Sequence, residues 1–168
     1  MLSSTSVLSA SAHMSVDAQS WAVADQSAQE ILSTIRPTVA SDCKRHKVIY
    51  YLQSLMREHF EVEVLPLGSV PLKTYLPGAD IDLTIVCDEN RKEVLDDICT
   101  FLQCGGEKNT EFVVNSVEYV PAQVAVVKCI VQDIAVDISF NQIAGYSAVH
   151  FLEKKNGLQV LMLLEMMV

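Results

Sequence analysis

Apolar residues recur every three or four positions in the first third of the chain, a spacing that is typical of amphipathic helices. One such stretch covers residues 17–35 and ends before Pro37, because proline disfavours the helical conformation in the residue that precedes it. A second stretch continues to about Phe60, and Ser41 or Asp42 is expected to cap its first turn. The pattern predicts two consecutive helices.

An alternation of apolar and polar residues follows, and it predicts strands over residues 61–65, 81–86, 111–119, 122–132 and 134–140. The last two strands are so close in sequence that a hairpin is expected between them. A helical spacing, capped by Asn90 and ended by Gly105 and Gly106, separates the second strand from the third. This order predicts an α+β fold in which a mixed, mainly antiparallel sheet of about five strands packs against helices on one face.

The pattern also divides the chain into three parts. Residues 1–16 have no periodicity and are expected to form a disordered leader. Residues 17–142 contain every predicted strand and are expected to be one domain. Residues 143–168 form a C-terminal tail in which a helical turn or two over residues 147–155 precedes an apolar stretch, 158–167, that is suited to dock on the core.

Three aspartates interrupt the predicted strands: Asp80 and Asp82 at the second, and Asp137 in the last. Side chains alternate between the faces of a strand, so these acids lie opposite the apolar rows. If the two strands are neighbours, the three carboxylates converge. Two like charges 4 Å apart repel by about 4 kcal/mol at an effective dielectric of 20, and a divalent cation would relieve that repulsion. Oxygen ligands favour a hard ion, Mg²⁺ or Mn²⁺.

A glycine and a serine, Gly68 and Ser69, precede these acids. Glycine lets the backbone approach a ligand closely, and a serine at the start of a short turn offers its hydroxyl and backbone N–H groups to a phosphate. A phosphate-binding turn followed by metal-binding acids predicts a site for a metal-chelated nucleoside triphosphate.

Together these motifs resemble the polymerase-β-like nucleotidyltransferases, and among them the noncanonical poly(A) polymerases and terminal uridylyltransferases. The stretches LPGADIDL and VKCIVQDIAVDISFNQ are similar to a plant branch of that group. The resemblance covers residues 21–142 and implies a catalytic palm domain that transfers AMP or UMP from a nucleoside triphosphate to an RNA 3′ end without a template, as in polyadenylation.

The resemblance also implies a role for each residue of the motifs. Asp80 and Asp82 would hold two metal ions, and Asp137 would hold the one that activates the RNA hydroxyl. Gly68 and Ser69 would bind the triphosphate. Family members continue into a helical domain, which is not visible after residue 142, so a protein partner could supply that half.

Two other interpretations remain open. The first is a truncated or inactive palm that binds a metal-nucleotide or a partner without turnover. The second is a sugar-nucleotide glycosyltransferase, whose metal-binding D-x-D motif requires neither the Gly-Ser turn nor a third acid. Among single residues, Lys128 is interpreted as a charge that protects a sheet edge, Lys73 as a solvated loop residue, and Gly145 as a residue that shapes the cleft wall.

The formal net charge of −9 arises after residue 60. Stand-alone nucleic-acid binders are normally basic, so the charge agrees with a missing polyanion-binding half. No apolar run reaches the length of about 18 residues that a membrane-spanning helix requires. The first basic residue is Arg36, which argues against a signal or transit peptide and predicts an intracellular protein of the nucleus or cytoplasm.

Overall fold

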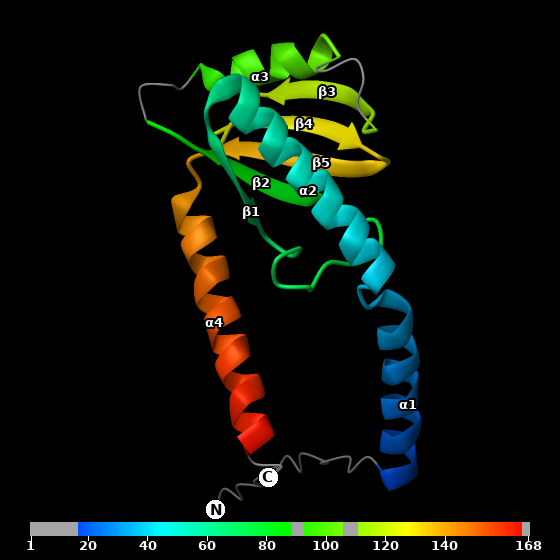
Figure 1. Ribbon diagram of the computed structural model, residues 1–168. Helices are drawn as coiled ribbons and strands as arrows, with labels where there is room; N and C mark the ends of the chain where they lie inside the picture. Colours follow the sequence, from blue (N-terminus) through cyan, green and yellow to red (C-terminus); the bar gives the residue numbers. More distant parts are fainter. Residues whose placement is uncertain (1–16, 89–92, 106–110, 166–168) are drawn as a thin grey trace, which may run out of the picture. The chain divides into compact units, whose positions relative to one another are not determined.

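The computed structural model describes residues 17–88, 93–105 and 111–165, and for residues 156–165 it describes the backbone alone (Figure 1). The elements follow one another as α1 (Ala18–Ile35), α2 (Val39–Phe60), β1 (Glu63–Leu67), β2 (Ile81–Val86), α3 (Val94–Gln103), β3 (Val114–Val120), β4 (Val126–Val131), β5 (Ile134–Phe140) and α4 (Ile143–Glu165). They form two units: α1 belongs to one, and all other elements belong to the second.

Helix α1 confirms the helix that the sequence predicts before Pro37. Asp17 caps it, because its Oδ1 accepts a hydrogen bond of 2.8 Å from the backbone N–H of Ser20. This bond, with a second from the Ser20 hydroxyl, holds the pKa of Asp17 below its usual value. Trp21 is 64% exposed, and α1 buries none of its residues.

Helix α2 begins earlier than predicted, and its cap is Thr38 rather than Ser41 or Asp42. Thr38 has an extended backbone and its side chain accepts a hydrogen bond from the N–H of Ser41, while the Ser41 hydroxyl accepts one from the N–H of Thr38. This reciprocal capping box satisfies two backbone donors of the first turn. Ser41 is therefore the third residue of the box, and the prediction of the cap was wrong.

The remaining elements confirm the predicted α+β fold. The five strands have the order β1-β2-β5-β4-β3, in which β2 and β5 are parallel and every other neighbouring pair is antiparallel. One apolar core joins this sheet to α2 and α3. Its fully buried members include Leu52, Met56, Ile81, Leu83, Ile85, Ile98, Leu102, Val127, Val131 and Ile138.

Strands β4 and β5 form the predicted hairpin. The turn residues Gln132 and Asp133 both have positive φ, of 52° and 63°, as in the type I′ turns that fit the twist of a two-residue hairpin. The register pairs Val131 with Ile134. Strand β1 is displaced from its predicted range, 61–65, and includes Pro66, which an edge strand tolerates because its free side needs no N–H donor.

The tail is one long helix, α4, rather than the predicted helical turn or two (Figure 1). It follows β5 directly. The side-chain amide of Asn141 exchanges two hydrogen bonds with the backbone of Cys87, and the N–H of Gln142 donates to Thr84 Oγ1 at 2.9 Å. These bonds fix the end of β5 beside the end of β2 and set the start of the helix.

Two predictions lie outside the described residues: the disordered leader over 1–16 and the docking of the side chains of 158–167. Asn90 itself also lies outside them, but α3 begins at Val94 with Glu93 in the cap position, so the prediction of a cap at Asn90 was wrong. Within the described residues, no helix is long and apolar enough to span a membrane.

Candidate active site

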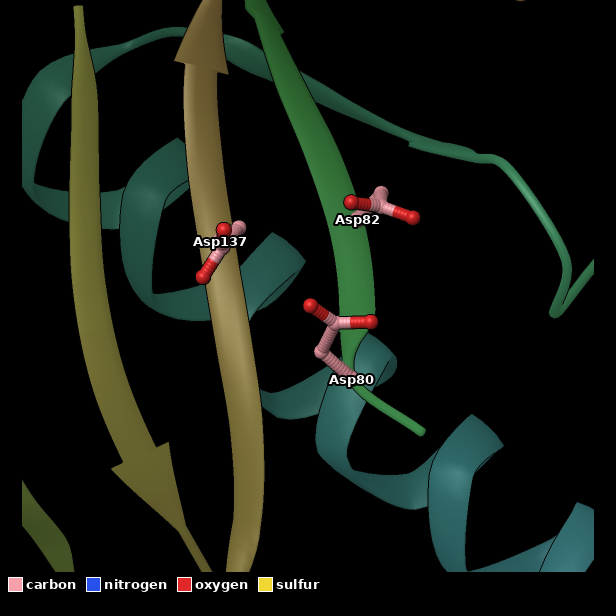
Figure 2. Close-up of side chains that lie close together, drawn as sticks. All are labelled: Asp80, Asp82 and Asp137. Atoms are coloured by element: carbon pink, nitrogen blue, oxygen red, sulfur yellow. The ribbon is translucent and has the colours of Figure 1, made fainter. Parts of the chain in front are cut away.

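The parallel pairing of β2 with β5 brings the three predicted acids together. Asp82 lies directly opposite Asp137, and Asp80 precedes the first residue of β2. One carboxylate oxygen from each acid lies within 4.8 Å of the others. Figure 2 shows Asp82 and Asp137 on the two neighbouring strands, with Asp80 where the chain enters β2. The two strands are therefore neighbours, and the three carboxylates converge as the sequence predicted for that case.

The alternation of faces along both strands is also as predicted. Ile81 and Leu83 are buried in the core on either side of Asp82, and Val136 and Ile138 are buried on either side of Asp137. The acids therefore occupy the face opposite the core. Two residues after Asp137 on the same face, the hydroxyl of Ser139 donates a hydrogen bond of 2.9 Å to the carbonyl of Leu83 and ties the two strands together.

The acids differ in their environment. Asp80 is exposed, whereas Asp82 and Asp137 are partly buried. Burial raises the pKa of Asp82, and the neighbouring charges of Asp80 and Asp137 raise it further, while the charge of Lys128 lowers it. Carboxylates whose mutual repulsion raises a pKa favour a shared cation. The donor set consists of oxygen atoms, which suits a hard divalent ion such as Mg²⁺ or Mn²⁺.

Lys128 is a member of the cluster that the sequence did not identify. It lies on β4, which is an interior strand between β5 and β3, so its interpretation as an edge charge was wrong. Its ammonium group forms an ion pair with Oδ2 of Asp137, and this bond holds the pKa of Lys128 above its usual value. The predicted hairpin contained the signal, because counting back from the two-residue turn places Lys128 opposite Asp137.

Gly68 follows β1 and packs against Asp82. Its φ is +66°, and a Cβ at this position would lie 2.4 Å from Oδ2 of Asp82, closer than nonbonded atoms can approach. Both the backbone conformation and the space therefore require glycine here. Ser69 begins the turn that follows, where its carbonyl accepts a hydrogen bond of 2.9 Å from the N–H of Thr74.

A hollow of about 240 Å³ opens where these residues meet. Gly68, Asp82 and Asp137 line it together with Leu67, Leu83, Val126 and Ser139. Gly145 of α4 faces Leu67, and a Cβ at Gly145 would be 3.7 Å from the leucine methyl group, an ordinary contact. Gly68 and two of the acids therefore line the same space, and Gly145 approaches it only through its contact with Leu67.

A buried arginine supports the loop that leads to Asp80. Arg45 of α2 is only 5% exposed; its guanidinium group lies 4.4 Å from the centre of the Tyr75 ring, and its Nη1 donates to the carbonyl of Asp80 at 3.4 Å. The Tyr75 hydroxyl donates to Asp42 at 3.0 Å. Lys73, which the sequence predicts to be a solvated loop residue, is 67% exposed and pairs with Asp42 at 3.2 Å. These contacts fasten the loop to α2.

Comparison with known proteins identifies the architecture. Residues 25–154 match the profile of the family described as poly(A) RNA polymerase, mitochondrial-like, central palm domain. No protein of curated function matches the chain in sequence.

Several solved structures have a similar fold, among them the following three. Cid1 in complex with the UTP analogue UMPNPP is 14% identical, covers 83% of this chain and 42% of its own, and superposes with a TM-score of 0.66. The GLD-2/RNP-8 complex is 16% identical and has a TM-score of 0.64, and the match covers 78% of this chain and 42% of that one. The structure of mtPAP in complex with ATPγS is 18% identical and has a TM-score of 0.63, and the match covers 74% of this chain and 30% of that one. At such low identity the likeness shows the fold alone, and this chain spans less than half the length of each.

Proposed function

Because the chain belongs to the family of mitochondrial-like poly(A) RNA polymerase central palm domains, we propose that it is the palm of a template-independent RNA nucleotidyltransferase. It would add AMP or UMP from a nucleoside triphosphate to RNA 3′ ends. The observation that carries this proposal is the convergence of Asp80, Asp82 and Asp137 beside Gly68, with one oxygen of each acid within 4.8 Å of the others.

The proposed roles of the residues are those that the family resemblance implies, and the positions of the side chains accord with them. Asp80 and Asp82 are proposed to ligate two divalent cations, Mg²⁺ or Mn²⁺, and Asp137 to ligate the one nearer the attacking hydroxyl. Such ions, when bound, lower the pKa of that hydroxyl and stabilise the departing pyrophosphate. Gly68 lets the backbone approach the triphosphate, and the adjacent Ser69 offers a hydroxyl and its N–H to it.

The other partners of the reaction are proposals of the same kind. RNA is a polyanion, and a chain with a net charge of −9 gives it little electrostatic attraction. The similar solved proteins are more than twice as long as the part that this chain covers. We therefore infer that the basic contacts to RNA and triphosphate come from a helical domain outside these 168 residues, either of the same protein or of a partner. An intracellular location in the nucleus or cytoplasm accords with this role in RNA 3′-end processing.

A second function is favoured by the same net charge of −9, which gives RNA little electrostatic attraction. In this function the palm binds a metal-nucleotide or a partner protein without turnover. In that case the three acids would still bind cations, because their geometry arises within the sheet, but the nucleotide would not be held in line with an RNA end.

A primer-extension assay on the 168-residue chain separates the two functions. A labelled oligoribonucleotide is offered each of the four nucleoside triphosphates with Mg²⁺ or Mn²⁺. The double variant Asp80→Asn/Asp82→Asn removes the proposed ligands. The matched control is Asp133→Asn, which removes an exposed carboxylate in the hairpin turn and introduces a residue that also tolerates positive φ.

Extension by the wild type and by Asp133→Asn, lost in the double variant, would establish the transferase and identify its nucleotide. Metal-dependent nucleotide binding without extension, again lost in the double variant, would establish the binding palm instead. If the double variant extends the primer as well as the wild type, the proposed site is wrong.

A further inference from the structure

A row of four charged residues crosses the sheet at the acid cluster. The strand registers place Glu118 of β3 opposite Lys128 of β4, Lys128 opposite Asp137 of β5, and Asp137 opposite Asp82 of β2. Side chains that lie directly opposite one another share a face and have Cβ atoms about 5 Å apart. Lys128 therefore stands between two carboxylates, one inside the acid cluster and one outside it.

The lysine is well placed to move between these neighbours. Its side chain is 48% exposed, whereas that of Asp137 is 23% exposed, so the ammonium group enters the cluster from the solvent side. Lysine carries a compact charge on a flexible stem with four methylene groups, which can reach either neighbour on the same face. Glu118 is exposed as well.

The contact with Asp137 has a consequence for cation binding. Oδ2 of Asp137 accepts a hydrogen bond from the ammonium group, so the same lone pairs are not offered to a metal ion. A positive charge beside the cluster also repels an entering cation. The ion pair and a bound divalent ion are therefore alternative ways of neutralising the same carboxylates.

We propose that Lys128 is a positioning residue that competes with the divalent cation for Asp137 and transfers its ion pair to Glu118 when the cation binds. The inference rests on the proposed function, because it assumes that Asp80, Asp82 and Asp137 form a metal site. It adds that two residues that are not metal ligands, Lys128 and Glu118, control the affinity of this site for the cation.

The test measures Mn²⁺ binding directly, from the electron paramagnetic resonance signal of free Mn²⁺ in titrations of the full 168-residue chain without substrate. Lys128→Met keeps most of the length of the side chain and removes its charge, so it should bind Mn²⁺ about tenfold more tightly than the wild type. This is a modest change for the removal of a unit charge a few ångströms from the ion. Lys128→Arg keeps the charge and should bind as the wild type does. The matched control, Lys73→Met, removes a lysine paired with Asp42 of α2 and should leave the affinity unchanged.

Glu118→Gln tests the transfer. Without its second carboxylate, Lys128 remains on Asp137, and Mn²⁺ binding should weaken about threefold beyond the effect of the lost charge itself. That direct effect also occurs in the Lys128→Met background, so a double-mutant cycle subtracts it. A coupling between the two positions that is indistinguishable from zero overturns the transfer to Glu118.

The outcomes also separate this inference from the proposed function. If Lys128→Met binds Mn²⁺ no more tightly than the wild type, while Asp80→Asn/Asp82→Asn abolishes binding, the metal site stands and the competition is wrong. If neither the wild type nor Lys128→Met binds Mn²⁺ at millimolar concentration, the proposed metal site fails, and the inference fails with it. Circular dichroism of each variant checks that the fold is intact.

Discussion

The two sides of the acid cluster are held in place by different physical interactions. On the β1 side, Gly68 fits against Asp82 with no room for a Cβ, and the buried Arg45 supports the backbone of Asp80. On the β4 side, Asp137 is held by an ion pair with the half-exposed Lys128. Close-packed side chains permit little adjustment, because any added atom forces its neighbours to move. An exposed ion pair contributes little free energy, so its charged groups can exchange partners easily.

This difference predicts how substitutions on the two sides will behave. Substitutions on the β1 side, which we call the packed side, should alter the free energy of unfolding and the activity together, since the same contacts hold the fold and the site. Substitutions on the β4 side, which we call the charged side, should alter metal binding and activity while the fold remains intact.

The largest effect is expected for Asp137→Asn. The amide has the size of the carboxylate but no charge, so under the proposed function nucleotide transfer should fall by roughly a thousandfold or more. The free energy of unfolding should change by less than about 1 kcal/mol, because the lost ion pair is partly exposed and the repulsion with Asp82 is lost with it. Primer extension and urea unfolding measure the two quantities, and a large loss of stability would contradict the distinction between the sides.

Gly68→Ala should reduce both quantities. The positive φ costs about 1–2 kcal/mol for a residue with a Cβ, and the contact of 2.4 Å with Asp82 must be relieved by a shift of the acid itself. We expect a loss of stability of about 2 kcal/mol or more and at least about a hundredfold loss of transfer, since an ångström of misplacement has that effect.

The matched control for this variant is Gly105→Ala. Gly105 also has positive φ, +93°, but nothing lies within 4 Å of an added Cβ. It should lose only the backbone contribution, about 1 kcal/mol, and retain full activity. If Gly68→Ala behaves in the same way as Gly105→Ala, the contact with Asp82 has no importance for the site.

Arg45→Met should mainly affect stability. The substitution removes the guanidinium group from the Tyr75 ring and from the carbonyl of Asp80, and it should lower the free energy of unfolding by about 2 kcal/mol. Transfer should fall only about tenfold, since Asp80 loses support but keeps its carboxylate. Arg45→Lys keeps the charge but not the planar group that stacks on the ring, so its free energy of unfolding, measured in urea, should lie between those of the wild type and Arg45→Met. A fully stable Arg45→Met would show that the loop needs no such anchor.

Sequence patterns predicted the charged acids better than their supports. A strand has a strict period of two, so the face of Asp82 followed from its apolar neighbours, and the same reasoning applied to Asp137. Their pairing also required two strands separated in sequence to be neighbours, which alternation alone does not establish. Lys128 was misinterpreted because its meaning depends on the register of a hairpin rather than on its own strand.

The supports gave weaker signals for physical reasons. Arg45 occupies a position on the apolar stripe of α2, three residues before Val48, but a single charged residue in a helix usually lies in solvent. The length of α4 was underestimated because its charged residues Glu153, Lys154 and Lys155 follow one another instead of recurring along one face, so the sequence has little helical periodicity to detect. The cap at Thr38 was missed because Ser41, its partner in the capping box, is itself a favoured cap residue.

The smallest effect is expected from the titration of Asp82, the residue that both sides share. Burial and the charges of Asp80 and Asp137 raise its pKa in the folded protein. A raised pKa means that the folded state binds more protons than the unfolded one, so without metal the stability should fall as the pH rises from the usual aspartate range through the folded pKa. Urea unfolding in the presence of a chelator, from pH 4 to 7, should show this decline in the wild type and a shallower one in Asp82→Asn. Saturating Mn²⁺ should reverse the slope, because the cation binds the deprotonated cluster. If the stability of Asp82→Asn falls with pH as steeply as that of the wild type, the titrating groups are others than Asp82. The charges of Asp80 and Asp137 would then have no measurable effect on Asp82, and the β1 and β4 sides of the cluster would not be coupled electrostatically.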